Sequence, residues 1–480
     1  MSRLIVGPFN RVEGDLEVRL EVAGGAVARA EVVSPLYRGF ENMLRGKDVR
    51  DALVIAPRIC GICSVSQSVA ATRAIAAAQG LVPMPNGQLV TNIVHATENI
   101  ADHLTHFHLF FMPDFARPAY VARLWFDEMQ ARFGNGSGGS RRAMLAPRAE
   151  FLHVVGILAG KWPHTMTLQP GGAARVVTAN ELRRLSGVLA GFRRYLEAAL
   201  FGGPLDAFAA LTDEDALLAW AEARPRADLS LFLRASRDLG LNRLGRGNDH
   251  YLSFGAYPRD DTCLFAPGRV NCNDSAALDT ARITEDVSHA WLADDGPARH
   301  PIDGRTEPDP EMRTGYSWCK APRLDGAPAE TGALARLVVA GNPLLCSLTQ
   351  KGGNAEARIV ARMVEIARVL PEMERWLHAI RPEEPFIAHG ETPPAARGAG
   401  LTEAARGALG HWLRVEGGRI ANYQIIAPTT WNFSPRDASG TPGPLEQALV
   451  GLPVAAGEDV PVMVQHVVRS FDPCMVCTVH

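Results

Sequence analysis

Two C-x-x-C pairs near opposite ends of the chain constrain its fold more than any other feature. Cys60 and Cys63 stand in RICGIC, and Cys474 and Cys477 stand in DPCMVC, just before the end of the 480-residue sequence. Two such pairs can supply four thiolates to one soft metal ion. A fold that uses both pairs for one site must therefore bring its two ends together.

The spacing of the two pairs leaves the kind of site open. Zinc ribbons place their pairs about 15–20 residues apart, so a zinc site that joins the ends of a large chain would be unusual. Each pair can instead act as a separate redox dithiol. The third possibility is one site for another metal. The cysteine spacing by itself does not decide among a zinc site, two dithiols and another metal site.

The first 50 residues are predicted to be rich in β-structure. Apolar and polar residues alternate from Leu16 to Val22, which is the period of a half-buried strand. Gly24-Gly25 indicates a hairpin turn, after which VARAEVV resumes the strand pattern.

Residues 51–480 are predicted to form a mainly helical body. Thr178 and Glu181 have the spacing of a capping box. A second amphipathic helix, with an apolar face from Ile359 to Leu370, is predicted to end at Pro371. RFGNGSGGSRR (132–142) is predicted to be a flexible loop. Because neither a repeat nor a linker is evident, residues 1–480 are expected to form a single unit of the α+β class, mainly α.

Composition excludes some classes of protein. The formal net charge is -3, which does not favour binding to nucleic acid. The sequence has no run of about 18 apolar residues, so no membrane insertion is expected. The start, MSRLIVGPFNRVEGD, has too short an apolar run for a secretory signal. The chain is therefore expected to be cytoplasmic, although a partner could carry an export signal for both.

The residues around both cysteine pairs resemble the paired signatures of nickel–iron hydrogenase large subunits. These signatures are R-x-C-G-x-C at 58–63 and D-P-C-x-x-C-x-x-H at 472–480. Shorter segments with counterparts in that family follow the same order: RVEGDLEV (11–18), YRGFENMLRGKDVRDA (37–52), HFHLFFMPD (106–114), GKWPH (160–164), ITEDVSHAW (283–291), KAPRLDG (320–326), ARGALGHW (405–412) and NYQIIAPTTWNFSPRD (422–437). The resemblance covers most of the chain and implies the fold of that subunit, a central bundle of long helices with small peripheral antiparallel sheets.

The resemblance assigns a role to each cysteine of the two pairs. All four would bind nickel, and Cys63 and Cys477 would also bridge to an iron that carries carbonyl and cyanide ligands. Soft thiolates suit such a redox-active centre. The pocket for the cyanide and carbonyl ligands would be formed by Pro428, Thr429 and Thr430.

The resemblance also implies a second metal site near the C-terminus. Glu41, the carbonyl of Ile425 and His480 would hold Mg2+ or a similar ion. Carboxylate and carbonyl oxygens suit a hard cation.

Four further residues are expected to take part in catalysis through the resemblance. Glu13 matches a glutamate beside the nickel that relays protons, and a buried carboxylate can have its pKa raised into a useful range. Arg406, Asp114 and Asp472 match groups around the iron ligands and the open metal site, where an Arg can donate hydrogen bonds. The family has APRG where this chain has AARG around Arg406.

Four positions depart from the pattern of catalytic relatives. Gln67 and Asp15 stand where those relatives commonly have His. Ile62 and Phe110 fill positions that are usually Val and Leu and that line the gas route in the family. Bulkier side chains would narrow the route and exclude O2 better than H2. The combination resembles the regulatory, hydrogen-sensing hydrogenases, although both substitutions can also be compensated changes in a packed core.

The leading interpretation is a hydrogen sensor with low turnover. It would cleave H2 heterolytically at a nickel–iron centre, with the proton taken by a cysteine or by Glu13. The alternative is the processed large subunit of an energy-conserving uptake hydrogenase. Most catalytic large subunits are made with an extension beyond the final His, and this sequence stops at His480. A third possibility, a non-enzymatic scaffold like the hydrogenase-like subunit of respiratory complex I, is disfavoured because that relative lacks the four cysteines.

The interpretation implies several partners besides H2. The chain has no ferredoxin-like run of cysteines, so the iron–sulfur clusters are expected in a small subunit. A histidine kinase would receive the signal. Maturation accessory proteins would insert the metals.

Overall fold

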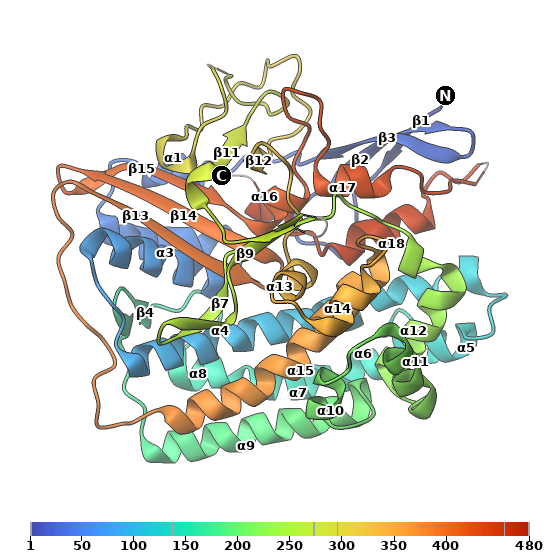
Figure 1. The fold of residues 1–480 in the computed structure, drawn as a ribbon, viewed down its shortest axis with the longest axis horizontal. Helices are drawn as coiled ribbons and strands as arrows, with labels where there is room; N and C mark the ends of the chain where they lie inside the picture. The colour runs from blue at the N-terminus through green and yellow to red at the C-terminus, as the bar shows by residue number, and fades with distance from the viewer. Residues whose placement is uncertain (1, 137, 272–273, 295, 456, 479–480) are drawn as a thin grey trace.

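Long helices form the body of the molecule. The computed structural model describes residues 2–136, 138–271, 274–294, 296–455 and 457–478. Helices α4 (Pro85–Thr105) and α15 (Ala355–Ala379) pack against each other through the centre, and α9 (Ala179–Tyr195) lies along α15 (Figure 1). Apolar side chains of all three helices share one buried core. The predicted class, mainly helical with small antiparallel sheets, is confirmed.

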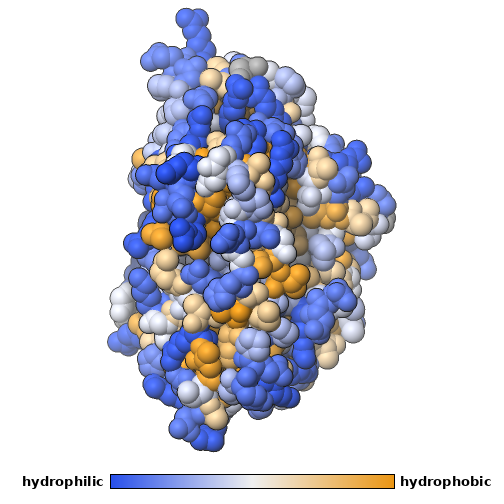
Figure 2. Space-filling model, turned by 90° about the vertical axis from the view of Figure 1, so that its left-hand side faces the viewer, coloured by the Kyte–Doolittle hydropathy of each residue, from blue (hydrophilic) through white to orange (hydrophobic). Residues whose placement is uncertain are grey.

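Shorter helices surround this central bundle. They are α1 (Phe40–Leu44), α2 (Ala52–Ile55), α3 (Ser64–Gln79), α5 (Phe126–Phe133), α6 (Gly139–Ala143), α7 (Leu145–Phe151), α8 (His153–Ala159), α10 (Leu205–Ala209), α11 (Glu214–Ala223), α12 (Asp228–Leu239), α13 (Ala333–Val339), α14 (Pro343–Leu348), α16 (Pro428–Asn432), α17 (Pro444–Leu449) and α18 (Val462–Ser470). In the described part of the chain, no helix combines the length and the apolar character that a membrane span requires. The face shown in Figure 2 is mainly hydrophilic, with scattered hydrophobic side chains.

The N-terminal segment forms the predicted hairpin. Strands β1 (Ser2–Val6), β2 (Glu17–Ala23) and β3 (Ala26–Val33) make an antiparallel sheet in that order. Gly24 and Gly25 have φ of 61° and 78°, which glycine adopts without strain. The buried face of this sheet packs on α17 and α18 from the end of the chain. The two ends of the sequence therefore share one small core (Figure 1).

A second sheet lies in the part of the chain that was predicted to be mainly helical. Strands β13 (Ala396–Ala404), β14 (Gly407–Glu416) and β15 (Arg419–Ile426) are antiparallel and pack across the alanine-rich helix α3. A Cβ at Gly398 would lie 2.0 Å from the carbonyl oxygen of Ala74, and a Cβ at Gly400 would lie 1.9 Å from that of Ala70. Glycine is therefore required where the sheet meets the helix backbone.

The remaining sheets are small and antiparallel. Three are two-stranded, and one has the order β10-β9-β6. Their strands are β4 (Leu168–Gln169) with β5 (Gly172–Ala173), β7 (Ala256–Arg259) with β8 (Thr262–Phe265), β11 (Ile283–Asp286) with β12 (Ala321–Leu324), and β6 (His250–Ser253), β9 (Gly268–Asn271) and β10 (Asp274–Ala276).

The prediction that a helix ends at Pro371 is wrong. Helix α15 continues through Pro371 to Ala379. Proline has no N–H to donate within the helix, which costs about 3 kcal/mol. Beyond the proline, Met373, Trp376 and Leu377 are fully or almost fully buried, and burial of such side chains contributes about 1.5–3 kcal/mol each. Tertiary packing therefore outweighs the local preference.

The predicted loop at 132–142 is also shorter than expected. Phe133 is buried at the end of α5, and α6 begins at Gly139. The carboxylate of Asp228 accepts hydrogen bonds from Arg132 and from the Ser140 hydroxyl, the latter at 2.7 Å. These contacts hold the two ends of the glycine-rich stretch in place.

Candidate metal centre

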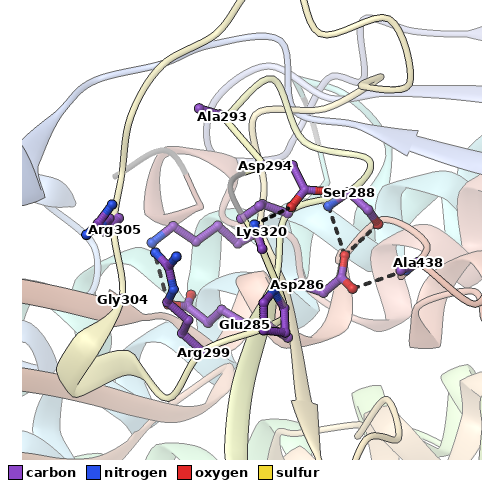
Figure 3. A pocket seen from close by; sticks show the side chains of 14 residues that line it. Glu285, Asp286, Ser288, Ala293, Asp294, Arg299, Gly304, Arg305, Lys320 and Ala438 are labelled. Atoms are coloured by element: carbon purple, nitrogen blue, oxygen red, sulfur yellow. Dashed lines mark hydrogen bonds and ion pairs between the residues drawn. The ribbon is translucent and has the colours of Figure 1, made fainter.

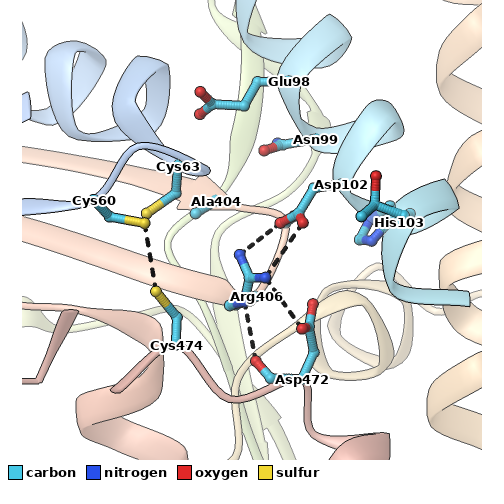
Figure 4. A network of polar contacts seen from close by, with 12 residues as sticks. Cys60, Cys63, Glu98, Asn99, Asp102, His103, Ala404, Arg406, Asp472 and Cys474 are labelled. Atoms are coloured by element: carbon cyan, nitrogen blue, oxygen red, sulfur yellow. Dashed lines mark hydrogen bonds and ion pairs between the residues drawn. The ribbon is translucent and has the colours of Figure 1, made fainter. Parts of the chain in front are cut away.

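The four thiols of the two C-x-x-C pairs converge at one buried point. All four Sγ atoms lie within 4.8 Å of one another. Cys60 Sγ lies 3.5 Å from Cys474 Sγ, and Cys63 Sγ lies 3.4 Å from Cys477 Sγ. Figure 4 shows the Cys60 and Cys474 sulfurs facing each other. Because each pair faces the other, the possibility of two separate dithiols is excluded, and the donors fit one soft metal centre.

One cysteine of each pair stands at the start of a helix. Cys63 is the N-cap residue of α3, and Cys474 is the N-cap residue of a short 3-10 helix, η10 (Met475–Cys477). One Nη atom of Arg38 donates to the carbonyls of Ile59, at 2.5 Å, and Val476, at 3.2 Å. This guanidinium therefore links the segment of the first cysteine pair to the segment of the second.

The N-terminal motif is joined to the second cysteine pair by the backbone. The N–H of Met475 donates to the carbonyl of Glu13 at 2.7 Å, and the N–H of Glu13 donates to the carbonyl of Pro473 at 3.4 Å. Gly14 has a φ of +81°, and a Cβ there would lie 2.9 Å from Val476. Only glycine fits this close approach.

Glu13 lies beside the thiols, as predicted from the sequence. Its side chain is half-buried, and burial and then the charge of Cys60 raise its pKa, while Arg406 and Arg38 oppose the rise. A carboxyl group whose pKa is raised can exchange a proton closer to neutral pH.

Arg406 is held by two carboxylates next to the sulfurs. It donates to Asp102 at 2.6 and 3.2 Å, to the Asp472 carboxylate at 3.1 Å and to the Asp472 carbonyl at 3.0 Å (Figure 4). The arginine and both aspartates are almost fully buried, and charge-assisted, bidentate hydrogen bonds of this kind fix geometry. Asp102 was not singled out from the sequence. Its signal was a carboxylate four residues after Glu98 in the largely apolar helix α4.

Asp114 lies in a second buried network, formed with Arg469 and Arg11. Its carboxylate accepts from Arg469 at 2.5 Å and from Arg11. Arg469 also donates to the carbonyl of Asn10 at 2.9 Å. Asp114 therefore anchors the segment that leads to Glu13, whereas Asp102 lies beside Arg406.

The predicted cyanide and carbonyl pocket lies against Cys474. Pro428, Thr429 and Thr430 begin helix α16 and are buried. The hydroxyl of Thr429 accepts from the N–H of Cys474 at 3.2 Å. The Thr430 hydroxyl is buried, with no hydrogen-bond partner among the described residues. An unsatisfied hydroxyl in the residue next to Thr429, which contacts Cys474, fits a small polar ligand of a bound metal.

The residues predicted to hold Mg2+ lie in a separate polar cluster. Glu41 accepts from the N–H of Ile425 at 2.7 Å, from Lys320 at 3.2 Å and from Thr306. Lys320 also lies 3.5 Å from Glu285. Glu285 Oε1 is buried and lacks a hydrogen-bond partner among the described residues. His480 lies outside the described residues.

A small cavity opens beside this cluster. Its volume is about 110 Å3, and Glu285, Lys320, Asp286 and Arg299 are among the residues that line it (Figure 3). Oxygen donors with an unsatisfied carboxylate oxygen suit a hard cation. The ammonium group of Lys320 lies between the Glu41 and Glu285 carboxylates.

Gln67 occupies the first full turn of α3 after Cys63. Its side-chain oxygen accepts from His411 at 2.8 Å, and the other ring nitrogen of His411 lies 2.8 Å from the Tyr423 hydroxyl. The amide nitrogen of Gln67 is buried, with no hydrogen-bond partner in the described part of the chain. Glutamine is thus oriented by a histidine here.

The other three positions that depart from the family pattern are not fully buried. Asp15 is exposed, and Ile62 and Phe110 are half-buried. Ile62 packs against the apolar cluster that contains the four cysteines. Phe110 lies in the π-helical turn η3 (His106–Phe111), and its carbonyl accepts from Arg11 at 3.2 Å. A role in gas access stays a prediction for both.

Comparisons with known proteins cover the whole chain. A family model described as nickel-dependent hydrogenase matches residues 38–124 and 143–480. The chain is 30% identical to the large subunit of the periplasmic [NiFeSe] hydrogenase of Desulfomicrobium baculatum, with 100% of this chain and 95% of that protein aligned. It is 28% identical to the Hydrogenase-2 large chain of Escherichia coli, with 100% and 97% aligned.

Further similarity is seen to an uptake enzyme and to solved structures. The chain is 26% identical to the uptake hydrogenase large subunit of Rhodobacter capsulatus, with 100% of this chain and 95% of that protein aligned. The structure of a reduced, active Ni-Fe-Se hydrogenase from D. baculatum matches with a TM-score of 0.85 at 28% identity, over 100% of both chains.

Proposed function

The chain belongs to the nickel-dependent hydrogenase family, and on this premise we propose that it senses hydrogen through a nickel–iron pair held by its four buried cysteines. As the large subunit of a nickel–iron hydrogenase, it is an oxidoreductase that acts on H2. Its fold is the large-subunit fold that the sequence resemblance implied.

The convergence of four buried thiols carries the metal assignment. A set of only soft sulfur donors suits a redox-active transition metal better than a hard cation. Cys63 and Cys477, whose sulfurs lie 3.4 Å apart, would bridge to the iron. Thr430 would donate its unsatisfied hydroxyl hydrogen to a cyanide or carbonyl ligand.

Residues of this chain would accept the proton released from H2 and balance the charge of the thiolates. When bound, a nickel–iron pair supplies the Lewis-acid and redox chemistry for heterolytic cleavage of H2. The carboxylate of Glu13, which lies beside Cys60, would accept the proton. Arg406 is fixed by Asp102 and Asp472, so its positive charge stays beside the thiolates and favours their ionised form.

Electrons would leave through a small subunit that carries the iron–sulfur clusters. Such clusters require several cysteines close together, whereas Cys263, Cys319 and Cys346 are free thiols outside the centre. Maturation proteins would insert the nickel and iron. A Mg2+ ion held by Glu41, the carbonyl of Ile425 and His480 belongs to the same proposal, supported by the unsatisfied oxygen of Glu285 in the neighbouring cluster.

Metal analysis and infrared spectroscopy test the centre. The purified large and small subunits, matured together, are expected to contain nickel and iron and to show carbonyl and cyanide bands. Cys477→Ser should lose both metals, whereas Cys346→Ser, at an exposed thiol, should keep them. Zinc as the sole metal in a fully matured sample would contradict the assignment.

The sensor role is supported by three departures from the pattern of catalytic relatives. Gln67 replaces a histidine one turn after Cys63 and is bonded to His411 instead. Ile62 and Phe110 add bulk at positions that line the gas route in the family. We infer low turnover and restricted access of O2, with the signal passed through the small subunit to a histidine kinase.

The sensitivity of H2 oxidation to O2 tests whether Ile62 and Phe110 restrict gas access or are only compensated changes in a packed core. Ile62→Val combined with Phe110→Leu should make H2 oxidation more sensitive to O2. Ile55→Val is the control, because Ile55 is half-buried against the same apolar cluster and has no proposed role in gas access. Unchanged O2 tolerance in the double variant would remove the gas-route argument.

An uptake hydrogenase is the second candidate, favoured by the relatives. The relatives described above are a periplasmic [NiFeSe] hydrogenase, Hydrogenase-2 and an uptake hydrogenase, and none of these three is named as a sensor. Turnover decides between the two roles: H2 oxidation with an artificial dye at or above ~10 s⁻¹, the middle of the range for enzymes, would favour uptake. A far lower rate would favour sensing.

A further inference from the structure

Glu98 is a buried carboxylate that contacts the first turn of α3. Its side chain projects from α4 and is 2% exposed. One oxygen accepts from the N–H of Ser66 at 2.9 Å and from the Ser66 hydroxyl at 3.0 Å. The other accepts from the N–H of Val65 at 2.8 Å and from the indole N–H of Trp162 at 3.0 Å. Glu98 thus joins three separate segments of the chain.

These contacts replace the cap that the helix lacks at its own N-terminus. Helices commonly begin with Ser, Thr, Asp or Asn, whose side chain accepts from the N–H of the second or third helical residue. Helix α3 begins instead after Cys63, whose side chain makes no such hydrogen bond. Val65 and Ser66 are those second and third residues, and both donate to Glu98. The carboxylate therefore caps α3 from a different helix and leaves the Cys63 thiol free.

The carboxyl group of Glu98 also lies at the end of α3 that carries Cys63. The N-terminus of a helix carries a partial positive charge that stabilises nearby anions. Both Glu98 and the Cys63 sulfur lie at this end of α3. Among the described residues Glu98 forms no ion pair, whereas the buried Glu365 and Glu403 both pair with Arg336. The helix end is therefore the positive partner of Glu98.

Helix α4 presents two carboxylates to the centre from one face. Glu98 and Asp102 stand four residues apart, which places them on the same side of a helix. Asp102 holds Arg406, and Glu98 lies above it toward the segment of Cys60 and Cys63 (Figure 4). One rigid element thus fixes both the arginine and the start of α3.

We propose that Glu98 is a positioning residue of the metal centre. It caps α3 in place of Cys63, which fixes the Cys63 sulfur and sets the electrostatic field at that thiolate. The role rests on the proposed nickel–iron centre, because it concerns the electron density that Cys63 donates to the metals.

Glu98→Gln tests the role with little change in volume. Glutamine can accept on one side only, so either Val65 or Ser66 loses its acceptor, and the negative charge that Glu98 carries above its pKa of about 7 is also lost. In the matured heterodimer, the carbonyl and cyanide stretching bands and the nickel EPR signal are expected to shift from those of the wild type. Nickel and iron are expected to stay bound.

Glu446→Gln is the matched control for loss of a buried carboxylate. Glu446 is fully buried and accepts from the N–H of Val32 at 3.0 Å and from the Tyr316 hydroxyl at 2.7 Å. It caps no element of the metal centre. Its substitution is expected to leave the infrared and EPR signals unchanged.

A milder variant keeps the test informative if Glu98→Gln does not fold. Trp162→Phe removes one hydrogen bond to Glu98 and is expected to shift the bands in the same direction by a smaller amount. Unchanged bands in the metal-loaded variant that folds would overturn the positioning role alone. A wild-type heterodimer without nickel and iron would overturn the proposed function together with this role.

Discussion

At the scale of single residues, the centre is a small set of thiols surrounded by fixed charges. Arg406 contributes the positive charge, and Asp102, Asp472 and Glu13 contribute carboxyl groups with different surroundings. The two aspartates are bound to the arginine. Glu13 is half-buried, and the largest influence on its pKa is burial. Burial raises the pKa of Asp102 as well, to about 7, but both aspartates are held in ion pairs with Arg406, whereas Glu13 forms no ion pair among the described residues, so Glu13 is the carboxyl group that is free to exchange a proton.

Glu13→Gln should separate proton transfer from metal binding. An amide cannot carry the proton, and loss of a positioned general base typically lowers a rate by about 10²–10⁴-fold. We expect H2 oxidation and H2/D2 exchange to fall by about this factor, with nickel and iron content unchanged. Glu383→Gln, at an exposed carboxylate with no role assigned in the centre, should leave the rate unaltered. Equal exchange rates in the Glu13 variant and the wild type would exclude Glu13 as the base.

At the scale of elements, local patterns predicted several structures correctly. The alternation from Leu16 to Val22 corresponds to β2, and the capping box of Thr178 and Glu181 begins α9. Each depends only on residues a few positions apart. Pro371 was misjudged because the local cost of proline is smaller than the packing gained beyond it. The strands of β13 to β15 were missed because their burial depends on the distant helix α3.

Gly14→Ala should weaken the junction between the N-terminal motif and the second cysteine pair. The left-handed φ alone costs about 1–2 kcal/mol for a residue with a Cβ, and the new Cβ would also meet Val476 at 2.9 Å. Gly24→Ala is the control, because Gly24 has a φ of +61° but no atom within 4 Å of an added Cβ. Thermal unfolding and nickel content should both fall further for Gly14→Ala. Equal losses in the two variants would show that the contact with Val476 is unimportant.

At the scale of the whole molecule, buried ionisable groups make the folded state sensitive to pH. Burial raises the pKa of Glu98, Glu403 and Glu446 to about 7. Burial lowers the pKa of His95 and His106 to about 3. The carboxyl groups favour the folded state at low pH, and the neutral histidines favour it at higher pH. The free energy of unfolding is therefore expected to be greatest between the pKa values of the two sets of groups, about 3 and about 7.

Glu446→Gln should flatten the decline of stability on the alkaline side. Folding raises the pKa of this carboxyl from 4.5 to about 7, so the folded state holds the proton more tightly. The resulting stability is present below about pH 4.5 and is lost as pH rises through 7, by up to about 3 kcal/mol. The unfolding temperature of the wild type should therefore drop relative to Glu446→Gln between pH 5 and pH 8. Glu383→Gln, at an exposed position, should parallel the wild type, and parallel curves for Glu446→Gln would refute the assignment.

The sequence by itself singled out the four cysteines that converge in the structure, because a C-x-x-C pair brings its two thiols together through local backbone geometry. It did not determine which charged groups surround them. Asp102 and Asp114 lie in one His-rich segment, yet Asp102 binds Arg406, 304 positions away, and Asp114 binds Arg469, 355 positions away. Asp102 lies in α4, whereas Asp114 lies beyond a π-helical turn in the 3-10 helix η4 (Met112–Ala116), so the two carboxylates meet different parts of the chain. Only tertiary packing decides such pairings, because no local pattern records what the distant chain brings opposite a side chain.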